Sequence, residues 1–346
     1  MKTIFNVVIL FFVLTSCQKE RITIGTNVSE TFYLDNGEAT MRLLVEGNTA
    51  SHTFLIFVHG GPGSGSFAYN TDYISQNIEN KYAVVYWDQR NAGASQGNSN
   101  GDHLNLDQMT DDLKKVIQLI KSRYGQDSGI FILGHSFGGL LTASFMTKEN
   151  NQSLVKGWIF ADGSHNYPLN DSLTRQMLLT IGQQQIALKR NTDNWKVITD
   201  YCNAHTGNFT FEESNQLFAY ATDAETYFEK VEKIDLATLL ADDPIKNDWP
   251  ITSLLLNMMY SSNASFNRDL AKTEFSSKLS VVTTPTLLLY GKYDFICPKG
   301  LEEDVFNRIS TTDKKLVISP ISGHNIMLQD EAFFCKEVNA FIESHK

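Results

Sequence analysis

The chain has 346 residues, of which 42% are hydrophobic and 11% aromatic, so it can bury a large core. Lys and Arg total 29 against 39 Asp and Glu, a formal net charge of −10, and no concentrated basic tract stands out. This balance argues against nucleic acid as a partner, because such a partner requires clustered cations opposite its phosphates. The acidic charge favours solubility and does not by itself select a substrate.

The N-terminus has the pattern of an export signal. Lys2 precedes an apolar run over residues 4–14, which has signal-peptide length and is too short to span a bilayer. The run ends in Leu14-Thr15-Ser16-Cys17, which resembles the lipobox of bacterial lipoproteins. The resemblance implies removal of residues 1–16 and lipidation of Cys17, giving an exported protein anchored to a bacterial membrane, either periplasmic or surface-facing. The alternative is an ordinary secretory signal with an incidental Cys.

If Cys17 carries lipid, three cysteines remain, Cys202, Cys297 and Cys335. An odd number argues against a disulfide framework. A single bridge between Cys297 and Cys335 and three buried thiols are both compatible with the sequence. Neither Cys-x-x-Cys nor His-Glu-x-x-His occurs, and the eight His are scattered, so we expect no metal site and no cofactor.

The elements of the mature chain begin with an expected antiparallel hairpin at residues 30–47, because Asn36-Gly37 is a typical hairpin turn. Apolar runs without alternation follow, as in strands buried on both faces, at 53–58, 82–87, 130–133, 157–161, 286–290 and 315–319. An amphipathic helix is predicted over 107–124, and further helices are expected directly after Ser136 and over 330–344. Strands alternating with helices predict an α/β fold with a doubly wound, mostly parallel sheet.

The sequence pattern changes between residues 164 and 280, where the apolar runs typical of buried strands no longer occur. Helix formers dominate at 173–190, 215–220 and 224–234. We therefore predict a core made of residues 21–163 and 281–346, with an inserted helical cap at 164–280. The cap would lie over the carboxyl edge of the sheet, where open α/β sheets bind ligands.

A nucleophile motif follows the strand at 130–133. Gly134-x-Ser136-x-Gly138 stands between this strand and the next predicted helix. A serine on so sharp a turn needs neighbours without side-chain bulk, and the turn raises its hydroxyl over the sheet at a helix N-terminus. We therefore predict Ser136 as the nucleophile.

A serine hydroxyl needs a base to take its proton and an acid to orient that base. In sites of this kind the partners follow in the order Ser, acid, His. Asp294 follows the strand at 286–290, and His324 follows the strand at 315–319, each on a loop. We predict Asp294 as the acid and His324 as the base. Asp162, which also ends a predicted strand, is the rival acid.

The oxyanion of the tetrahedral intermediate requires two donors. The backbone N–H of Phe137 is one expected donor, and Gly61, in the loop after the strand at 53–58, is the other. The same loop contains Gly63-x-Gly65-x-x-Ala68 followed by Asp88, which imitates a dinucleotide fingerprint. The complete Ser, Asp and His set favours the hydrolase interpretation.

These motifs together resemble the proline iminopeptidase branch of the α/β-hydrolases, serine peptidase family S33. The residues that carry the resemblance are His59-Gly60-Gly61-Pro62-Gly63, Trp87-Asp88-Gln89-Arg90, the Ser136 turn, Gly291 to Asp294, and Gly323-His324. The resemblance implies the α/β-hydrolase fold and an exopeptidase that releases N-terminal residues, often proline, from short peptides through an acyl-enzyme.

In this family acidic cap residues hold the free amine of the substrate. The corresponding candidates in the present cap are Glu212, Glu213, Glu225, Glu229 and Glu232. Two departures leave other functions open: Asn91 stands where the family usually has Gly, and GHSFGG is common among generic esterases. A carboxylesterase of small acyl esters is the first alternative, and a ligand-binding protein without turnover is the second.

Overall fold

The computed structural model of the protein describes residues 22–37, 39–97, 104–232 and 263–346. Its strands form one sheet in the order β1-β2-β4-β3-β6-β7-β8-β9, with β5 (Gln96–Gly97) paired to β2. The predicted hairpin is confirmed, because β1 and β2 pair antiparallel with Asn36 opposite Ala39. From β4 to β9 every neighbouring pair is parallel. The strands are β1 (Val28–Asn36), β2 (Ala39–Gly47), β3 (Thr53–Val58), β4 (Ala83–Trp87), β6 (Gly129–Ser136), β7 (Gly157–Gly163), β8 (Thr286–Gly291) and β9 (Lys314–Ser319).

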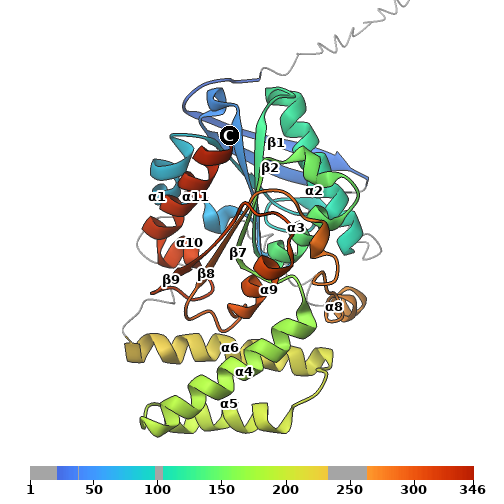
Figure 1. Cartoon of the computed structure of the whole chain (residues 1–346). Coiled ribbons are helices and arrows are strands. Elements are labelled where there is room, and N and C mark those ends of the chain that lie inside the picture. The colour runs from blue at the N-terminus through green and yellow to red at the C-terminus, as the bar shows by residue number, and fades with distance from the viewer. Residues whose placement is uncertain (1–21, 38, 98–103, 233–262) are drawn as a thin grey trace, which may run out of the picture.

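Helices cover both faces of this sheet (Figure 1). Phe54, Ile56 and Val58 of β3 belong to a core shared with one set of helices, while Leu55 and Phe57 belong to the core on the opposite face. The first set is α2 (Leu106–Tyr124), α3 (Phe137–Thr147) and α9 (Gly300–Arg308), and the second is α1 (Asp72–Ile74), α10 (Ile326–Gln329) and α11 (Glu331–His345). Burial on both faces explains why the strands read as uninterrupted apolar runs, and the predicted doubly wound α/β fold is confirmed.

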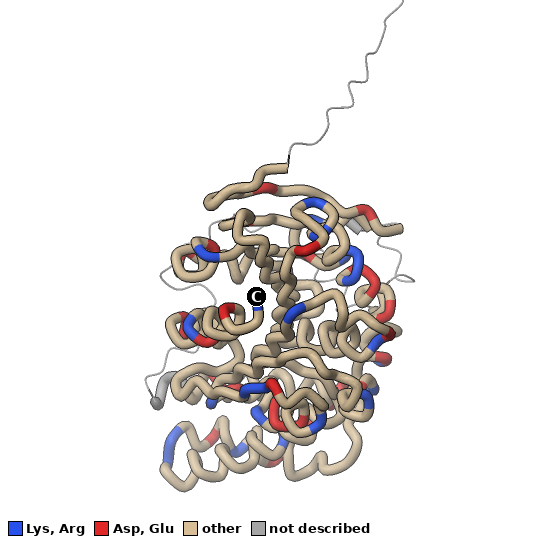
Figure 2. Tube along the Cα trace, turned by 45° about the horizontal axis from the view of Figure 1, so that its top comes forward, with Lys and Arg blue, Asp and Glu red and all other residues tan. Residues whose placement is uncertain are grey.

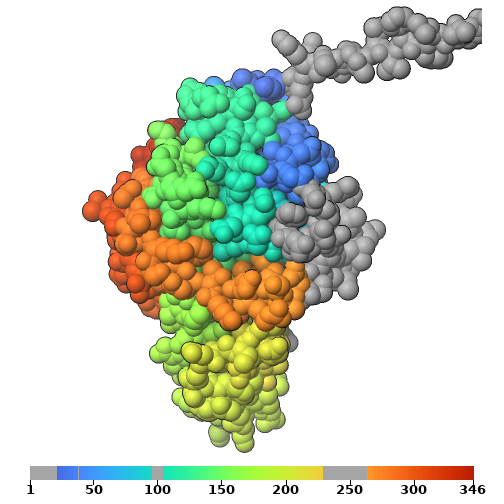
Figure 3. All heavy atoms as spheres, turned by 90° about the vertical axis from the view of Figure 1, so that its right-hand side faces the viewer, coloured from blue at the N-terminus to red at the C-terminus, as the bar shows by residue number. Residues whose placement is uncertain are grey.

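Between β7 and β8 the described residues include three long helices that project from one end of the molecule (Figures 1 and 3). We call them the cap helices: α4 (Tyr167–Ala187), α5 (Thr192–Ala204) and α6 (Phe211–Glu232). They share their own apolar cluster, which includes Leu178, Trp195 and Leu217 and reaches Phe295 of the core. A short helix, α8 (Ala264–Leu270), then returns the chain to α3 through a contact between the Phe137 and Phe266 rings, whose centroids are 6.3 Å apart.

The cap helices differ in detail from the predicted segments. α4 begins at Tyr167, because the Asn166 side chain accepts the Leu169 N–H at 3.0 Å and Pro168 occupies the first turn. The predicted segments at 215–220 and 224–234 belong to one helix, α6, as far as Glu232, and residues 233–234 lie outside the described ranges. α5 was not predicted. The boundaries at 164 and 280 between core and cap remain predictions.

Lys and Arg positions are interspersed with those of Asp and Glu along the described trace (Figure 2). Within the ranges that the structure describes, no helix combines the length and the apolar character needed to cross a membrane. Cys202, Cys297 and Cys335 are all free and buried, so the interpretation as three thiols holds and the bridge between Cys297 and Cys335 is absent. Cys17 lies outside the described residues.

Candidate active site

Ser136 lies at the junction of β6 and α3 with strained backbone angles, φ 55° and ψ −123°. Such a positive φ is uncommon outside glycine and marks a turn that the surrounding fold imposes. A Cβ on Gly134 would lie 2.3 Å from Thr142 Oγ1, and one on Gly138 would lie 1.9 Å from the carbonyl oxygen of Val58. Both glycines are therefore required by close packing, as the motif predicts.

The three residues predicted as a triad form one hydrogen-bonded chain. The Ser136 hydroxyl donates to His324 Nε2 at 3.0 Å, and His324 Nδ1 donates to Asp294 Oδ2 at 2.9 Å. The other oxygen of Asp294 accepts the backbone N–H groups of Ile296 and Cys297 at 2.8 and 2.7 Å. Burial lowers the pKa of His324, so the ring is neutral at neutral pH and Nε2 is available to take a proton.

Asp162, the rival acid, occupies a different position. Its two carboxylate oxygens accept the N–H of Gly291 at 2.8 Å and the N–H of Ile326 at 2.9 Å. These amides belong to the last residue of β8 and the first residue of α10, which border the loops that carry Asp294 and His324. Asp162 therefore joins the two loops, while Asp294 takes the orienting contact with His324. Burial raises the pKa of the Asp162 carboxyl well above its usual range.

The loop after β3 lies directly on the nucleophile. A Cβ on Gly60 would lie 2.8 Å from Ser136 Cβ, and Gly61 has a φ of 117°, which glycine tolerates best. Gly61 and Phe137 both line the cavity beside Ser136. The two predicted donors therefore both border the cavity beside Ser136, and their role toward an oxyanion stays a prediction.

The residues that imitate a dinucleotide fingerprint instead hold this loop in place. Asp88 accepts the N–H and the hydroxyl of Ser66 at 2.6 and 2.7 Å. Gln89 donates its side-chain amide to the carbonyl of His59 at 2.8 Å. Asp88 and Gln89 therefore support the glycine-rich loop, and the acidic residue is engaged by protein groups.

A second hydrogen-bonded chain, which no sequence motif marks, links the glycine-rich loop to the base. The Gly60 N–H donates to the Tyr69 hydroxyl at 3.1 Å, which donates to His135 Nδ1 at 2.8 Å. His135 Nε2 donates to the carbonyl of His324 at 2.7 Å. The carbonyl accepts only, so the tautomer of His135 is fixed, and burial lowers its pKa to about 3.

The cavity above Ser136 has a volume of about 620 Å³ and is bounded by residues of the core and of α4 and α6. One buried carboxylate lines it, that of Asp171 on α4, which accepts the Ser214 hydroxyl at 2.8 Å. Burial raises the pKa of Asp171 to about 6. Ser164 Oγ and Asn170 Oδ1, on residues that also line the cavity, are buried without a partner among the described residues. No motif marks any of these three residues.

The candidate cap glutamates lie in different environments. Glu225 is buried, accepts the Phe295 N–H at 3.2 Å beside Asp294, and has a pKa raised to about 8, mainly by burial. Glu212 is exposed, and Glu213 accepts the Thr210 N–H at 2.7 Å at the start of its own helix. The side chains of Glu229 and Glu232 lie outside the described part of the structure. Of the three glutamates whose side chains the structure describes, Glu225 is the one placed beside the triad.

The parallel sheet, the serine on its strained turn and the cap helices above it define an α/β-hydrolase. The family model described as "Serine aminopeptidase, S33" matches residues 49–331. The chain belongs to this family of hydrolases.

Individual relatives within this fold are distant and include both peptidases and esterases. The chain is 20% identical to "Probable aminopeptidase YbaC" of Bacillus subtilis (strain 168), over 90% of this chain and 96% of that protein. The crystal structure of a proline iminopeptidase from Mycobacterium smegmatis superposes with a TM-score of 0.63 at 16% identity, covering 91% and 98% of the two chains. An esterase, EaEST from Exiguobacterium antarcticum, gives a TM-score of 0.55 at 17% identity, covering 92% and 100%.

Proposed function

We propose that the protein is a serine exopeptidase that releases N-terminal residues from short peptides through an acyl-enzyme. Ser136 attacks the carbonyl carbon of the first peptide bond while His324 takes the hydroxyl proton, and Asp294 stabilises the imidazolium. The N–H groups of Gly61 and Phe137 receive the oxyanion. His324 then protonates the departing amine, and a water molecule activated by the same base releases the N-terminal residue.

The observation that carries the peptide proposal is the chemistry of the cavity wall. The Asp171 carboxylate and the unpartnered oxygens of Ser164 and Asn170 all accept hydrogen bonds. An ammonium group has three donors and a positive charge, and a partly desolvated carboxylate gives it a charge-assisted hydrogen bond. The free N-terminus of a peptide has this chemistry, and a volume of about 620 Å³ is suited to a small ligand.

A carboxylesterase acting on small acyl esters is the second candidate. It would use the same Ser136, His324 and Asp294, and the GHSFGG turn together with the esterase of similar fold supports it. An ester without an amine offers no cationic group for the Asp171 carboxylate to bind. Ligand binding without turnover is the third candidate, and the continuous hydrogen bonding from Ser136 to Asp294 weighs against it.

We also propose that the enzyme is exported and held at a bacterial membrane by lipid on Cys17. The support is the sequence alone, in the apolar run at 4–14 and the Leu14-Thr15-Ser16-Cys17 pattern. The catalytic part would then act on peptides outside the cytoplasm.

A matched substrate panel tests the peptidase proposal. Aminoacyl amides, short peptides with and without an N-terminal acetyl group, and short acyl esters are compared by kcat/KM with one enzyme preparation. We expect free-amine peptides and amides to be cleaved and the acetylated peptides to be poorer. Cleavage of esters alone would support the carboxylesterase, and failure of every substrate with intact folding would support the binding protein.

A further inference from the structure

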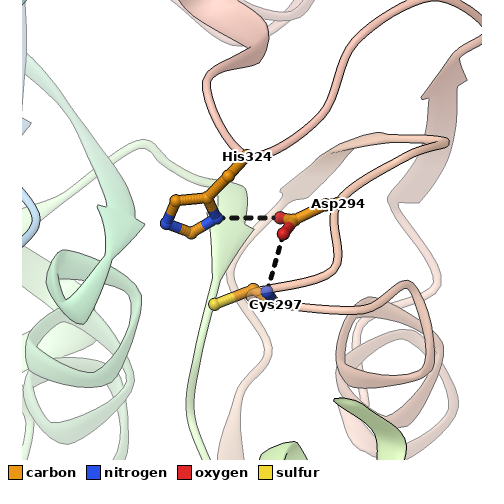
Figure 4. Close-up of side chains that lie close together, drawn as sticks. All are labelled: Asp294, Cys297 and His324. Carbon is orange, nitrogen blue, oxygen red and sulfur yellow. Dashed lines mark hydrogen bonds and ion pairs between the residues drawn. The ribbon is translucent and has the colours of Figure 1, made fainter. Parts of the chain in front are cut away.

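One side chain beside the triad has no role in the proposed reaction. Figure 4 shows Cys297 next to the pair formed by Asp294 and His324. A carboxylate oxygen of Asp294, the sulfur of Cys297 and a ring nitrogen of His324 lie within 4.8 Å of one another, and all three residues are buried. Sulfur of Cys, nitrogen of His and oxygen of Asp are the donor atoms by which proteins bind Zn²⁺.

We propose that Asp294, Cys297 and His324 form a zinc site, and that zinc bound there switches the hydrolase off. The regulatory part of this proposal rests on the proposed serine mechanism, whereas the site itself does not. No motif marks the set in the sequence, because Asp294 and Cys297 share one loop and His324 lies on another.

The positions of the ligands suit a tetrahedral ion after a small adjustment. Zinc bonds of about 2.3 Å to sulfur and about 2.0 Å to nitrogen place those two atoms roughly 3.6 Å apart around the ion. The widest pair therefore closes by at most roughly 1 Å, a movement that rotation of the Cys297 side chain can supply. Asp294 is already oriented, because the N–H groups of Ile296 and Cys297 hold Oδ1 and leave Oδ2 toward His324.

The surroundings provide an entry path to these three residues. Cys297 lines the cavity that also contains Ser136, so an ion can enter where substrate enters, and water can be the fourth ligand.

Zinc at this position prevents His324 from acting as the base, although the residue itself is unchanged. Coordination through Nδ1 moves the proton of the neutral His324 ring from Nδ1 to Nε2, and the thiol proton of Cys297 leaves to solvent. Nε2 then carries a proton and cannot accept the one on the Ser136 hydroxyl, to which it is now bonded at 3.0 Å. The ion also occupies the place of the hydrogen bond from His324 to Asp294.

The experiment uses the chelator-treated full chain and two metals. Labelling of Ser136 by a fluorophosphonate is measured against free Zn²⁺ set by a metal buffer. We expect a loss of at least about 10-fold in the labelling rate, reversed by EDTA. Co²⁺ replaces zinc in a parallel titration, and a thiolate-to-metal charge-transfer band should appear at one equivalent.

Two cysteine variants identify the ligand. In Cys297→Ser the cobalt band should vanish, and the free zinc concentration needed for inhibition should rise on the order of 10-fold. Each labelling rate is divided by the metal-free rate of the same variant. Cys335→Ser, which alters another buried thiol on α11, should keep both responses. Equal zinc sensitivity of Cys297→Ser and the unchanged enzyme, or a cobalt band that survives in that variant, would overturn the proposal.

A third variant keeps the test independent of catalysis. In His324→Ala, cobalt binding should weaken on the order of 10-fold, and the cobalt spectrum reports this without any activity measurement. Unchanged cobalt binding in this variant would also overturn the site. If the metal-free enzyme fails to react with the fluorophosphonate, the proposed serine mechanism fails. The cobalt spectra would still decide whether the site exists.

Discussion

Replacing Asp171 with Asn tests whether this carboxylate recognises the substrate amine. The change keeps the shape of the side chain and an oxygen that can accept the Ser214 hydroxyl, now at 2.8 Å, and it removes the charge. Asp171 is 6% exposed, so water screens little of its attraction for an ammonium group.

The expected magnitude follows from the strength of a charge-assisted hydrogen bond, about 1.5–3 kcal/mol, against about 0.5–1.5 kcal/mol for a neutral one. At 1.4 kcal/mol per decade, acetylation of the substrate should lower kcat/KM of the unchanged enzyme roughly 10-fold to 100-fold. In Asp171→Asn the same acetylation should lower kcat/KM only roughly 2-fold to 10-fold, since a neutral hydrogen bond replaces the charged one.

The preference should also depend on pH. Burial raises the pKa of Asp171 to about 6, so the carboxylate is ionised above this value and protonated below it. The ratio of kcat/KM for free and acetylated peptide should therefore be largest near pH 7 and fall as the pH drops through about 6, because kcat/KM reports the free enzyme and the free substrate. Above about pH 8 the substrate's own α-amino group loses its proton, and the ratio should fall again. Between about pH 5 and 7 the ratio for Asp171→Asn should stay flat.

The assay compares one peptide with its acetylated form across pH, with Glu212→Gln as the matched control. That variant removes an exposed carboxylate from a cap helix and leaves the cavity intact, so it should behave like the unchanged enzyme. A free-amine preference that persists in Asp171→Asn but disappears in Glu225→Gln would assign the amine to Glu225. No preference in the unchanged enzyme would refute amine recognition altogether.

Three further predictions concern the triad, the second hydrogen-bonded chain and the anchor. Ser136→Ala or His324→Ala should lower turnover on the order of 10⁴-fold, since the triad acts as a unit, and near-normal rates in a pure Ser136→Ala sample would exclude the mechanism. Tyr69→Phe leaves the Gly60 N–H without its acceptor, which costs about 1–3 kcal/mol. Because this hydrogen bond positions the glycine-rich loop beside Ser136, kcat should fall roughly 10-fold with little change in KM. A lower melting temperature with unchanged kcat would contradict this positioning of the loop by Tyr69. Cys17→Ser should move the protein out of the detergent phase with kcat/KM unchanged, and partitioning that ignores the substitution would refute lipidation.

The fold was predictable because its signals are local. Residues 53–58 form a strand with the predicted bounds, since a run buried on both faces needs no alternation. α5 was missed although Trp195, Ile198 and Cys202, which are buried, stand at helical spacing. One helix of 13 residues with a polar remainder gives a weak pattern, and packing against α4 supplies the rest of its stability.

The triad was predictable for the same reason, and the cavity was not. Ser136, Asp294 and His324 each follow a recognisable strand, and the order along the chain assigns their roles. Asp171 becomes part of the site only because α4 and α6 meet, and nothing near it in the sequence marks that meeting. Glu225 was one of five candidate glutamates, and its burial and its contact with the Phe295 N–H distinguish it from Glu212 and Glu213.

The contact between Glu225 and Phe295 limits how enzymes of this kind can be recombined. Glu225 belongs to a cap helix, yet it accepts the N–H of Phe295, the residue that follows the triad acid. A chimaera with foreign helices in place of α4 to α6 would bury this amide without an acceptor, at a cost of about 1–3 kcal/mol in the loop that fixes Asp294. Single substitutions on the cavity wall can therefore change the substrate range, whereas a transplanted cap must also supply a hydrogen-bond acceptor for the Phe295 N–H.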